Sequence, residues 1–384
     1  MRNKRKHSDG VFLLPEGDLK KPSSPQITML LLLFTGLLGI GLINLYSASV
    51  GAGFFWAQTR NLVITLSAFV IFGWIVSIKQ VAAYTYWFVG LICVLLMIVL
   101  FTGRVAGGAQ RWISLGPLSF QPSEFAKIGM ALLLARFFSS NRQDSPYRLR
   151  DLMPLLMMMG LIFALIFAQP DFGTAGICLL IAICQLAFIR IDLRSIAAVL
   201  LAMPFIAAVG WNTLLMPYQK LRILNLLNPN LDPQNTGYHA LQSLIAVGSG
   251  GIFGKGFMQG TQAHLRFLPE RHTDFIFSVF SEEHGFWGSV LIFMGFGLLT
   301  YIALDIAKHC KDTFTALLAV GLGSLIFLEF AINVAMVMGI FPVVGIPLPF
   351  FSYGSSAMLT ICTAIGLLIS INRNNMGSRK TQQY

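Results

Sequence analysis

The sequence predicts an all-α protein with ten helices that cross a membrane. Hydrophobic residues make up 55% of the 384 residues and charged residues only 11%, whereas soluble domains carry roughly 25% charged residues. A bilayer core about 30 Å thick needs about 20 apolar residues for each helix that spans it. A soluble core with a charged shell is therefore excluded. The ten apolar runs lie near residues 28–49, 62–78, 83–102, 123–138, 153–168, 172–189, 195–216, 286–307, 313–338 and 352–372.

The distribution of Lys and Arg predicts the orientation of these helices. With both termini in the cytoplasm, 18 of the 27 Lys and Arg residues fall in cytoplasmic segments, which retain positive charge during insertion. The short outer loops then hold Arg60, Arg104 and Arg111. The net charge of +11 follows from this bias, so it gives no reason to propose a nucleic-acid partner.

The apolar runs divide the chain into a membrane domain and its polar segments. Residues 1–27 are polar, charged and contain three prolines, which is typical of a disordered cytoplasmic tail. The membrane domain is expected at 28–372, with a long periplasmic loop at 217–285 between the seventh and eighth helices. Residues 373–384 form a second cytoplasmic tail. The five cysteines show no paired spacing on the outer face, so no disulfide framework is expected.

A first polar cluster precedes the fourth apolar run. Arg111 and Trp112 come first in the chain. Ser123 is a suitable helix N-cap, and Glu124 is a favourable acid for the first turn. Lys127 lies one turn after Glu124 on the same helix face. This pattern fits either a capped helix with an interfacial Trp or a ligand site. An ionisable group inside a membrane span costs at least ~2.5–3.5 kcal/mol and usually marks a polar pathway. Lys127 therefore favours the ligand site.

Polar residues elsewhere in the apolar runs are expected to have packing roles. Asp171, after Pro170, is interpreted as a turn residue and helix N-cap, with a substrate contact as the alternative. Glu329 and Asn333 lie four residues apart in the ninth run. Because a buried carboxylate is expensive, they are expected to hydrogen-bond each other or a neighbouring helix.

The stretch from 234 to 283 is where chemistry is most strongly indicated. It is the only long run of mixed polar character between apolar segments. An apolar helical period near 239–250 predicts an interfacial or re-entrant helix, and the glycines that follow permit a close approach of the backbone to a ligand or a helix. GGIFGKG resembles a phosphate loop but lacks the first glycine and the final Ser or Thr of that motif. Together with its flank, the stretch collects four of the six histidines, His239, His264, His272 and His284.

The segment LPERHTDFIFSVFSEEHG has the sharpest local pattern in that stretch. Thr273 can cap a new helix, and Asp274 can favour its dipole. From that start, Asp274 shares one polar face with two serines and Glu282. A polar face beside Arg271 and His272 in an apolar protein indicates a substrate cavity open to the outer side. A dipole-matched cap with a surface stripe is the alternative.

Five segments of the chain resemble the SEDS family of peptidoglycan glycosyltransferases, in the same order and over nearly the whole length. The resemblance is closer to the branch that acts in cell elongation and rod-shape maintenance than to the branch that acts in division. At Ser355 the chain departs from the family pattern SYGG, which bears on the packing of that outer loop. The matching segments are AQRWISLGPLSFQPSEFAK, AQPDFGTA, NTGYHALQSLIAVGSGGIFGKGFMQGTQAHLRFLPERHTDFIF, EEHGFWG and GIPLPFFSYGSS.

The resemblance implies a ten-helix enzyme of the bacterial inner membrane that polymerises lipid II into glycan strands on the periplasmic side and releases undecaprenyl pyrophosphate. It implies a class B penicillin-binding protein, together with other membrane proteins of the elongation complex, as partners. It implies that Asp274 is the essential acid and that Trp112, Glu124 and Lys127 are functionally sensitive. It also implies a divalent cation, Mg or Mn. The sequence contains no preformed metal cage, and Mg²⁺ commonly binds through one or two carboxylates plus substrate phosphates.

The chemistry of this reaction assigns roles to the polar residues. The 4-hydroxyl of one sugar attacks the anomeric carbon of another, and a base that accepts its proton contributes typically ~10²–10⁴-fold. Asp274 is the candidate base. Positive charge stabilises the leaving pyrophosphate, and Arg111, Lys127, Lys255 and Arg271 are the candidates for that role. The full set of candidate substrate-binding residues is Arg111, Trp112, Glu124, Lys127, Lys255, Arg271 and His272.

Other functions remain open alongside this one. A flippase for the same lipid-linked precursor would be expected to have an internal repeat and a site at the bilayer midplane, whereas this chain has no evident repeat and its ionisable residues gather toward one face. A scaffolding subunit would not need an intramembrane Lys127. The partner's membrane helix is expected to pack on the eighth and ninth runs, because small residues let helices approach closely. The glycines concerned are Gly285, Gly288, Gly295, Gly297, Gly321 and Gly323.

Overall fold

The computed structural model describes residues 24–49, 53–106, 109–115, 118–228, 236–261 and 270–380. The expected tail up to residue 23 and His264 lie outside these residues. The helices are α1 (Ser24–Ala48), α2 (Phe54–Val70), the π-helical turn η1 (Ile71–Ile75), α3 (Ile78–Thr102), α4 (Pro122–Ser140), α5 (Leu149–Ala168), α6 (Phe172–Leu186), α7 (Leu193–Val209), the π-helical turn η2 (Gly210–Leu214), α8 (Pro217–Leu227), α9 (Thr236–Ser249), α11 (Ile276–Lys308), α12 (Thr313–Val337) and α13 (Ser355–Lys380).

A small antiparallel sheet joins α3 to α4. Its strands are β1 (Arg104–Ala106), β2 (Ala109–Leu115) and β3 (Leu118–Phe120), in the order β1-β2-β3. Trp112 lies opposite Arg104, and Ile113 lies opposite Phe120. Aromatic and β-branched residues favour such extended pairing. The prediction of an all-α protein with a plain outer loop here was therefore incomplete.

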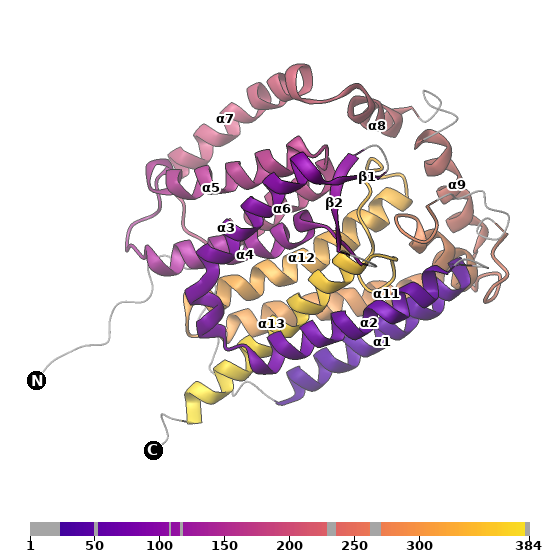
Figure 1. The fold of residues 1–384 in the computed structure, drawn as a ribbon, viewed down its shortest axis with the longest axis horizontal. Helices are drawn as coiled ribbons and strands as arrows, with labels where there is room; N and C mark the ends of the chain where they lie inside the picture. The colour runs from indigo at the N-terminus through magenta and orange to yellow at the C-terminus, as the bar shows by residue number, and fades with distance from the viewer. Residues whose placement is uncertain are drawn as a thin grey trace, which may run out of the picture.

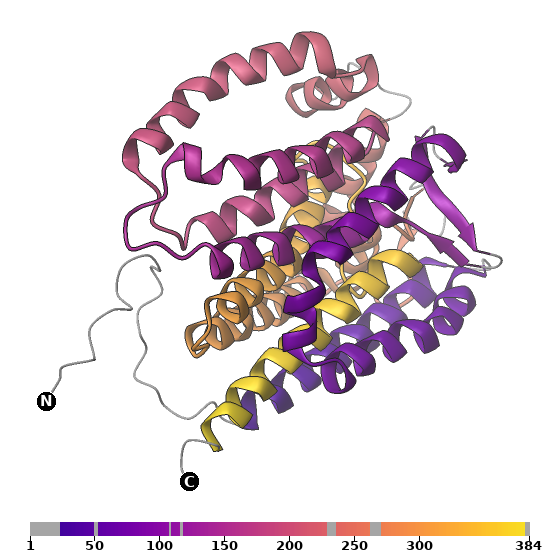
Figure 2. The same cartoon turned by 60° about the vertical axis from the view of Figure 1, so that its left-hand side comes forward.

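The long helices form a bundle whose two ends differ. The start of α1 and the end of α13 lie at one end, whereas the small sheet, α8 and α9 lie at the other (Figures 1 and 2). A helix is present where one was expected near 239–250, as α9 (Thr236–Ser249). The polar segments predicted to face outward therefore gather at the end of the bundle opposite the C-terminal helix end.

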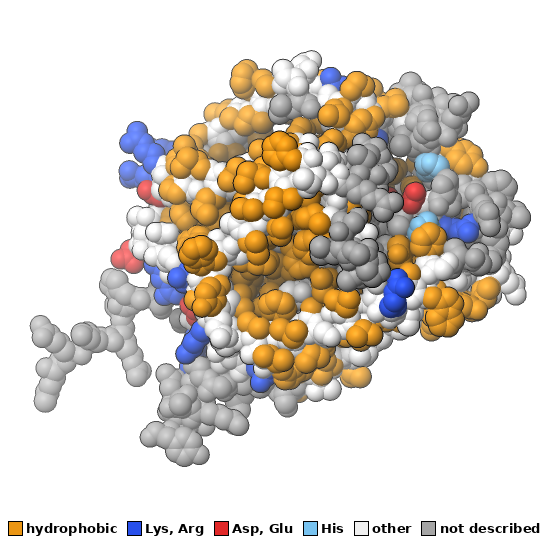
Figure 3. Space-filling view, in the orientation of Figure 1, with side chains coloured by type: hydrophobic (Ala, Val, Ile, Leu, Met, Phe, Trp, Pro, Cys, Tyr) orange, Lys and Arg blue, Asp and Glu red, His pale blue; other side chains and the backbone are white. Residues whose placement is uncertain are grey.

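Burial decreases from the centre of the bundle to its edge. In the apolar windows of α12 and α13, 78% and 83% of residues are buried, against 6% in α7. Both views place α7 at the periphery (Figures 1 and 2). Figure 3 shows apolar side chains over the flank of the bundle, with most of the visible Lys and Arg at the end where α13 terminates. Such an apolar flank suits a lipid environment.

Each of the ten apolar runs coincides with a helix of the described chain, and eight of these helices are long and apolar enough to cross a membrane. The two others are α4 and α6. In α4, Glu124, Lys127 and Arg136 interrupt the apolar sequence, although nearly the whole helix is buried. In α6, the helix has only 15 residues.

The starts of α2 and α11 differ most from the prediction. α2 begins at Phe54 rather than near residue 62, so Arg60 lies on a helix and not in an outer loop. α11 begins at Ile276 and includes both the helix expected to start near Thr273 and the apolar run expected to start near residue 286. The start of α2 was placed too late because four polar residues, 58–61, interrupt its apolar sequence after the first turn.

α11 is two helices joined at Gly285. This residue has φ 65° and ψ −158°, a backbone conformation that only glycine adopts readily. The glycine-rich segment before α11 is bound at the break: the backbone N–H of Lys255 donates to the carbonyl of Glu282 at 3.0 Å, and that of Phe286 donates to the carbonyl of Gly251 at 2.9 Å. The break at Gly285 thus separates a short helix, 276–284, from the longer helix that follows it.

The glycines of α11 and α12 mostly close the bundle on itself. A Cβ atom at Gly295 would meet Leu37 of α1, one at Gly321 would meet α4 and α6, and one at Gly323 would meet Ala303 of α11. Gly297 has open space around it. The predicted use of these glycines as a docking face for a partner helix is therefore wrong for those that pack inside the bundle.

Candidate functional site

Asp274 lies in a turn immediately before α11. The helix begins at Ile276 with Phe275 as its N-cap and no side-chain capping bond, so the predicted capping role of Thr273 is wrong. Three successive carbonyls of this turn accept hydrogen bonds from distant groups: His272 from the backbone N–H of Tyr353 at 2.8 Å, Thr273 from the Ser352 hydroxyl at 2.6 Å, and Asp274 from the Asn333 amide at 2.9 Å. The turn is fixed by tertiary contacts, not by a helix cap.

The Asp274 carboxyl group is partly buried and electrostatically perturbed. Burial raises the pKa of Asp274 to about 6, the negative charge of Glu270 adds to the rise, and the positive charges of Arg222 and Arg111 oppose it. Gly345 lies against it, because a Cβ atom there would be 3.4 Å from Oδ2 of Asp274. A carboxyl group with a pKa near 6 can accept a proton from a hydroxyl near neutral pH.

A pocket with two arginines lies at the end of the bundle that carries the small sheet and α8. Arg111 comes from β2 and Arg222 from α8, where Arg222 stacks over the Tyr218 ring at 5.6 Å. Burial lowers the pKa of Arg222, which remains a cation because arginine titrates far above neutrality. The arginine pocket is lined by Arg111, Pro170, Phe172, Tyr218, Gln219, Arg222, Ile223, Pro342 and Val344.

Arg222 was missed by the sequence analysis. The available signal was the spacing of Tyr218 and Arg222, which places an aromatic ring and a cation on one face of a helix. On its own, that spacing cannot indicate which pocket the pair faces.

Arg111 is held at the pocket by the turn before α6. Its Nε donates to the carbonyl of Gln169 at 3.2 Å, and a terminal nitrogen donates to the carbonyl of Pro170. A second terminal nitrogen lies 3.6 Å from Asp171. The neighbouring Trp112 is only partly buried in β2.

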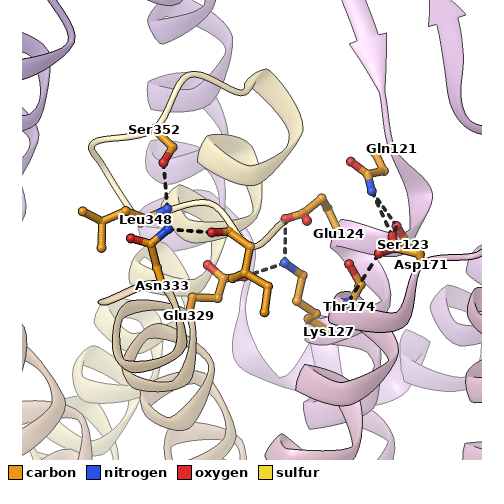
Figure 4. Close-up of polar contacts among 11 residues, drawn as sticks. Gln121, Ser123, Glu124, Lys127, Asp171, Thr174, Glu329, Asn333, Leu348 and Ser352 are labelled. Carbon is orange, nitrogen blue, oxygen red and sulfur yellow. Dashed lines mark hydrogen bonds and ion pairs between the residues drawn. The ribbon is translucent and has the colours of Figure 1, made fainter. Parts of the chain in front are cut away.

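Asp171 joins the start of α6 to the start of α4 (Figure 4). Its side chain accepts from the backbone N–H of Thr174 at 3.4 Å, which confirms the predicted N-cap of α6. It also accepts from Ser123 at 3.0 Å and Gln121 at 3.2 Å. Gln121, not Ser123, is the N-cap residue of α4; the predicted cap is wrong because the Ser123 hydroxyl binds Asp171 instead.

Glu124, Lys127 and Glu329 form a buried ion triad between α4 and α12 (Figure 4). The Lys127 ammonium lies 2.8 Å from Glu124 and 2.5 Å from Glu329. Lys127 is 1% exposed, and its charge is directed at these two carboxylates. The expected placement of Glu124 and Lys127 on one helix face is confirmed, and the expected partner of Glu329 on a neighbouring helix is Lys127.

The other predicted substrate-binding residues lie apart from the arginine pocket. Lys255 binds Glu282 at 2.6 Å, Arg271 donates to the carbonyl of Ala48 at 2.9 Å, and His272 stacks on Phe54 with ring centroids 3.9 Å apart. Burial lowers the pKa of His272, so its ring is neutral near pH 7. The structure therefore relates Asp274 to Arg111 and Arg222, while these three side chains bind neighbouring elements.

In the described part of the chain, no group of three or more His, Cys, Asp and Glu residues is placed to hold a metal ion. Mg²⁺ commonly binds through one or two carboxylates plus substrate phosphates, a mode that needs no such group.

Comparison with known proteins places the chain in a family. The FtsW/RodA/SpoVE family, described as a cell cycle protein, matches residues 26–377. The chain belongs to this family. Peptidoglycan glycosyltransferase MrdB of Escherichia coli (strain K12) is 40% identical over 283 residues, 73% of this chain and 76% of MrdB. Peptidoglycan glycosyltransferase RodA of Treponema pallidum (strain Nichols) is 33% identical and covers 91% of this chain and 98% of its own length.

Solved structures have the same fold. A chain from a structure of a peptidoglycan synthase complex, described for coordination of polymerization and crosslinking, matches with a TM-score of 0.78 at 29% identity and covers 90% of this chain and 97% of its own. The crystal structure of Thermus thermophilus rod shape determining protein RodA matches with a TM-score of 0.65 at 26% identity, and the match covers 90% of this chain and 96% of that one.

Proposed function

We propose that this chain is a peptidoglycan glycosyltransferase of the RodA type, a hexosyltransferase that polymerises lipid II into glycan strands during cell elongation. The activity named for its relatives supports the reaction. The observation that carries the proposal is the Asp274 carboxyl group, with its pKa raised to about 6 and with Arg222 and Arg111 acting on it. This arrangement brings together a base and cations, as a glycosyl transfer from a pyrophosphate requires.

Asp274 acts as the general base. Its ionised carboxylate takes the proton of the acceptor 4-hydroxyl while the hydroxyl oxygen forms a bond to the anomeric carbon of the donor sugar. The bond from that carbon to undecaprenyl pyrophosphate breaks, and the leaving group takes the electron pair. Above a pH of about 6 most of the base is in its active form.

Arg111 and Arg222 stabilise the leaving pyrophosphate. They are the two cations of the pocket, and guanidinium groups match phosphate oxygens in geometry. Lys127 has a different role, because its ammonium already binds two carboxylates. It joins α4 to α12 beneath the site. A divalent cation, Mg or Mn, would be held largely by oxygens of the substrate pyrophosphate, whose charge it would neutralise.

The proposal includes the membrane topology. The ten apolar helices span the inner membrane, both termini face the cytoplasm, and the arginine pocket opens to the periplasm. The clustering of Lys and Arg at the end where α13 terminates supports this orientation (Figure 3), because cytoplasmic loops retain positive charge.

A class B penicillin-binding protein and other elongation-complex proteins are the proposed partners. The solved synthase complex described for polymerization and crosslinking supports an assembly of this kind.

The experiment that tests the function is polymerisation of labelled lipid II by the purified protein, with and without Mg²⁺ or Mn²⁺, resolved on a gel. Glycan polymer is the expected product. Transfer of lipid II across a vesicle bilayer without any polymer would support the flippase instead.

A further inference from the structure

The turn that carries Asp274 is held by side chains from two other segments. Asn333 of α12 donates to the Asp274 carbonyl, and Ser352, in the loop before α13, donates to the Thr273 carbonyl. Ser352 also accepts from the backbone N–H of Leu348 at 2.7 Å, which fixes its own loop. Figure 4 shows Ser352 bound to Leu348 within this loop, and Asn333 near Glu329.

Asn333 connects the acid to the loop that packs on it. The same amide nitrogen of Asn333 donates to the Ile346 carbonyl at 2.7 Å. The residue before Ile346, Gly345, lies against the Asp274 carboxyl group. Two carbonyl acceptors on one atom require that atom to be the amide nitrogen, which fixes the orientation of the side chain. Asn333 is fully buried, at 0% exposed, so water cannot replace these bonds.

The buried ion triad of Glu124, Lys127 and Glu329 fixes the position of Asn333, whose amide nitrogen bonds two carbonyls. Glu329 lies one helical turn before Asn333 and is bound to Lys127 of α4. The position of Asn333 along and around α12 is therefore fixed by a buried contact with another helix.

We propose that Asn333 and Ser352 are positioning residues for Asp274, a role that rests on the function proposed above. They set the place of its carboxylate relative to the arginine pocket without touching the substrate. Misplacement of a catalytic group by 1 Å can cost about 10²-fold in rate. Loss of either donor lowers kcat and leaves substrate binding intact.

Gln185 provides a matched control. This α6 residue is also 0% exposed, and its amide nitrogen also bridges two backbone carbonyls, those of Ala131 at 3.0 Å and Leu317 at 2.8 Å. Leu317 lies about 24 Å from Asn333 along α12, at about 1.5 Å per residue. Replacing Gln185 removes the same kind of bridge far from Asp274.

The test compares Asn333→Ala, Ser352→Ala and Gln185→Ala in lipid II polymerisation, with melting temperature measured for each. We expect kcat to fall about 10- to 100-fold in the first two with KM within about twofold of the parent, and the pH at which kcat is half-maximal to move as well. Gln185→Ala should lose stability and keep the parent's kcat and pH profile. Ser352→Ala leaves only a small cavity and is expected to fold. If Asn333→Ala does not fold, the kcat of Ser352→Ala tests the positioning role.

Two results would overturn the positioning role: unchanged kcat in the folded variants, or an equal loss of kcat in Gln185→Ala. Failure of the parent protein to make polymer would instead contradict the proposed function.

Discussion

The Asp274 carboxyl group is subject to charges from three separate parts of the chain. Glu270 comes from the same turn, Arg222 from α8 and Arg111 from β2. Burial has the largest effect and favours the neutral acid, Glu270 adds to it, and the arginines favour the carboxylate. The balance places the base close to the pH at which it has to work.

Activity should therefore respond in opposite directions to two neutralising substitutions. Because the base must be ionised, kcat should rise with pH through about 6. Arg222→Gln removes a charge that lowers the pKa of Asp274, so the rise should move to higher pH. Glu270→Gln removes a charge that raises this pKa, so the rise should move to lower pH. The measurement is kcat for lipid II polymerisation between pH 5 and pH 8.

Lys220 of α8 supplies the control for that pair. It lies over the Trp211 ring at 5.9 Å and is not among the charges that act on Asp274. Lys220→Gln should leave the pH profile in place. If Arg222→Gln and Glu270→Gln moved the profile in the same direction, these charges would not set the pKa of the base.

At the scale of elements, α4 and α12 are joined by a buried triad of two carboxylates and one ammonium group. An ion pair that is buried is costly to break, since the remaining charge has no partner. The acids Glu124 and Glu329 would face each other if Lys127 were lost.

Lys127→Met should therefore destabilise the protein by about 3–5 kcal/mol, seen as aggregation or a lowered melting temperature in detergent. Adding Glu124→Gln and Glu329→Gln to Lys127→Met should restore much of the stability, because no buried charge is left. If Lys127→Met instead folded like the parent and lost only polymerisation, Lys127 would be a pyrophosphate ligand.

The break in α11 is a second feature of this scale. It lets the segment around Gly254 approach so closely that a Cβ atom at Gly285 would lie 2.3 Å from the Gly254 nitrogen. The short helix 276–284, which follows Asp274, is thereby anchored to the loop before it.

Gly285→Ala should destabilise the protein, by roughly 1–3 kcal/mol from the backbone conformation alone, which is essentially limited to glycine, and further from the clash. Gly297→Ala is the matched control on the same helix, because it has open space around it and alanine is the better helix former. Thermal unfolding of both variants measures the difference. Equal melting temperatures would mean that the break is not a structural requirement.

At the scale of the whole molecule, local signals in the sequence predicted local structure well. Apolar runs predicted the helices, and Asp171, after Pro170, was identified as an N-cap; its partner Thr174 is only three residues away. Glu124 and Lys127 were placed on one helix face by their spacing of three residues.

Contacts between distant segments could not be predicted in this way. Glu329 reaches Lys127 across 202 positions of the chain, and Asn333 reaches Asp274 across 59. Single-sequence periodicity carries no information on such pairs. The arginine pocket, with Arg222 in it, is also made by elements that meet only in the folded bundle.

The central claim, that Asp274 is the base of a glycan polymerase, is tested most directly by polymerisation of labelled lipid II with the parent protein and with Asp274→Asn. The substitution keeps the shape of the side chain and removes its basicity. The account predicts a folded protein with the parent's behaviour on size exclusion and a polymerisation rate lowered at least ~10²-fold. Polymerisation by Asp274→Asn at the parent's rate would contradict it.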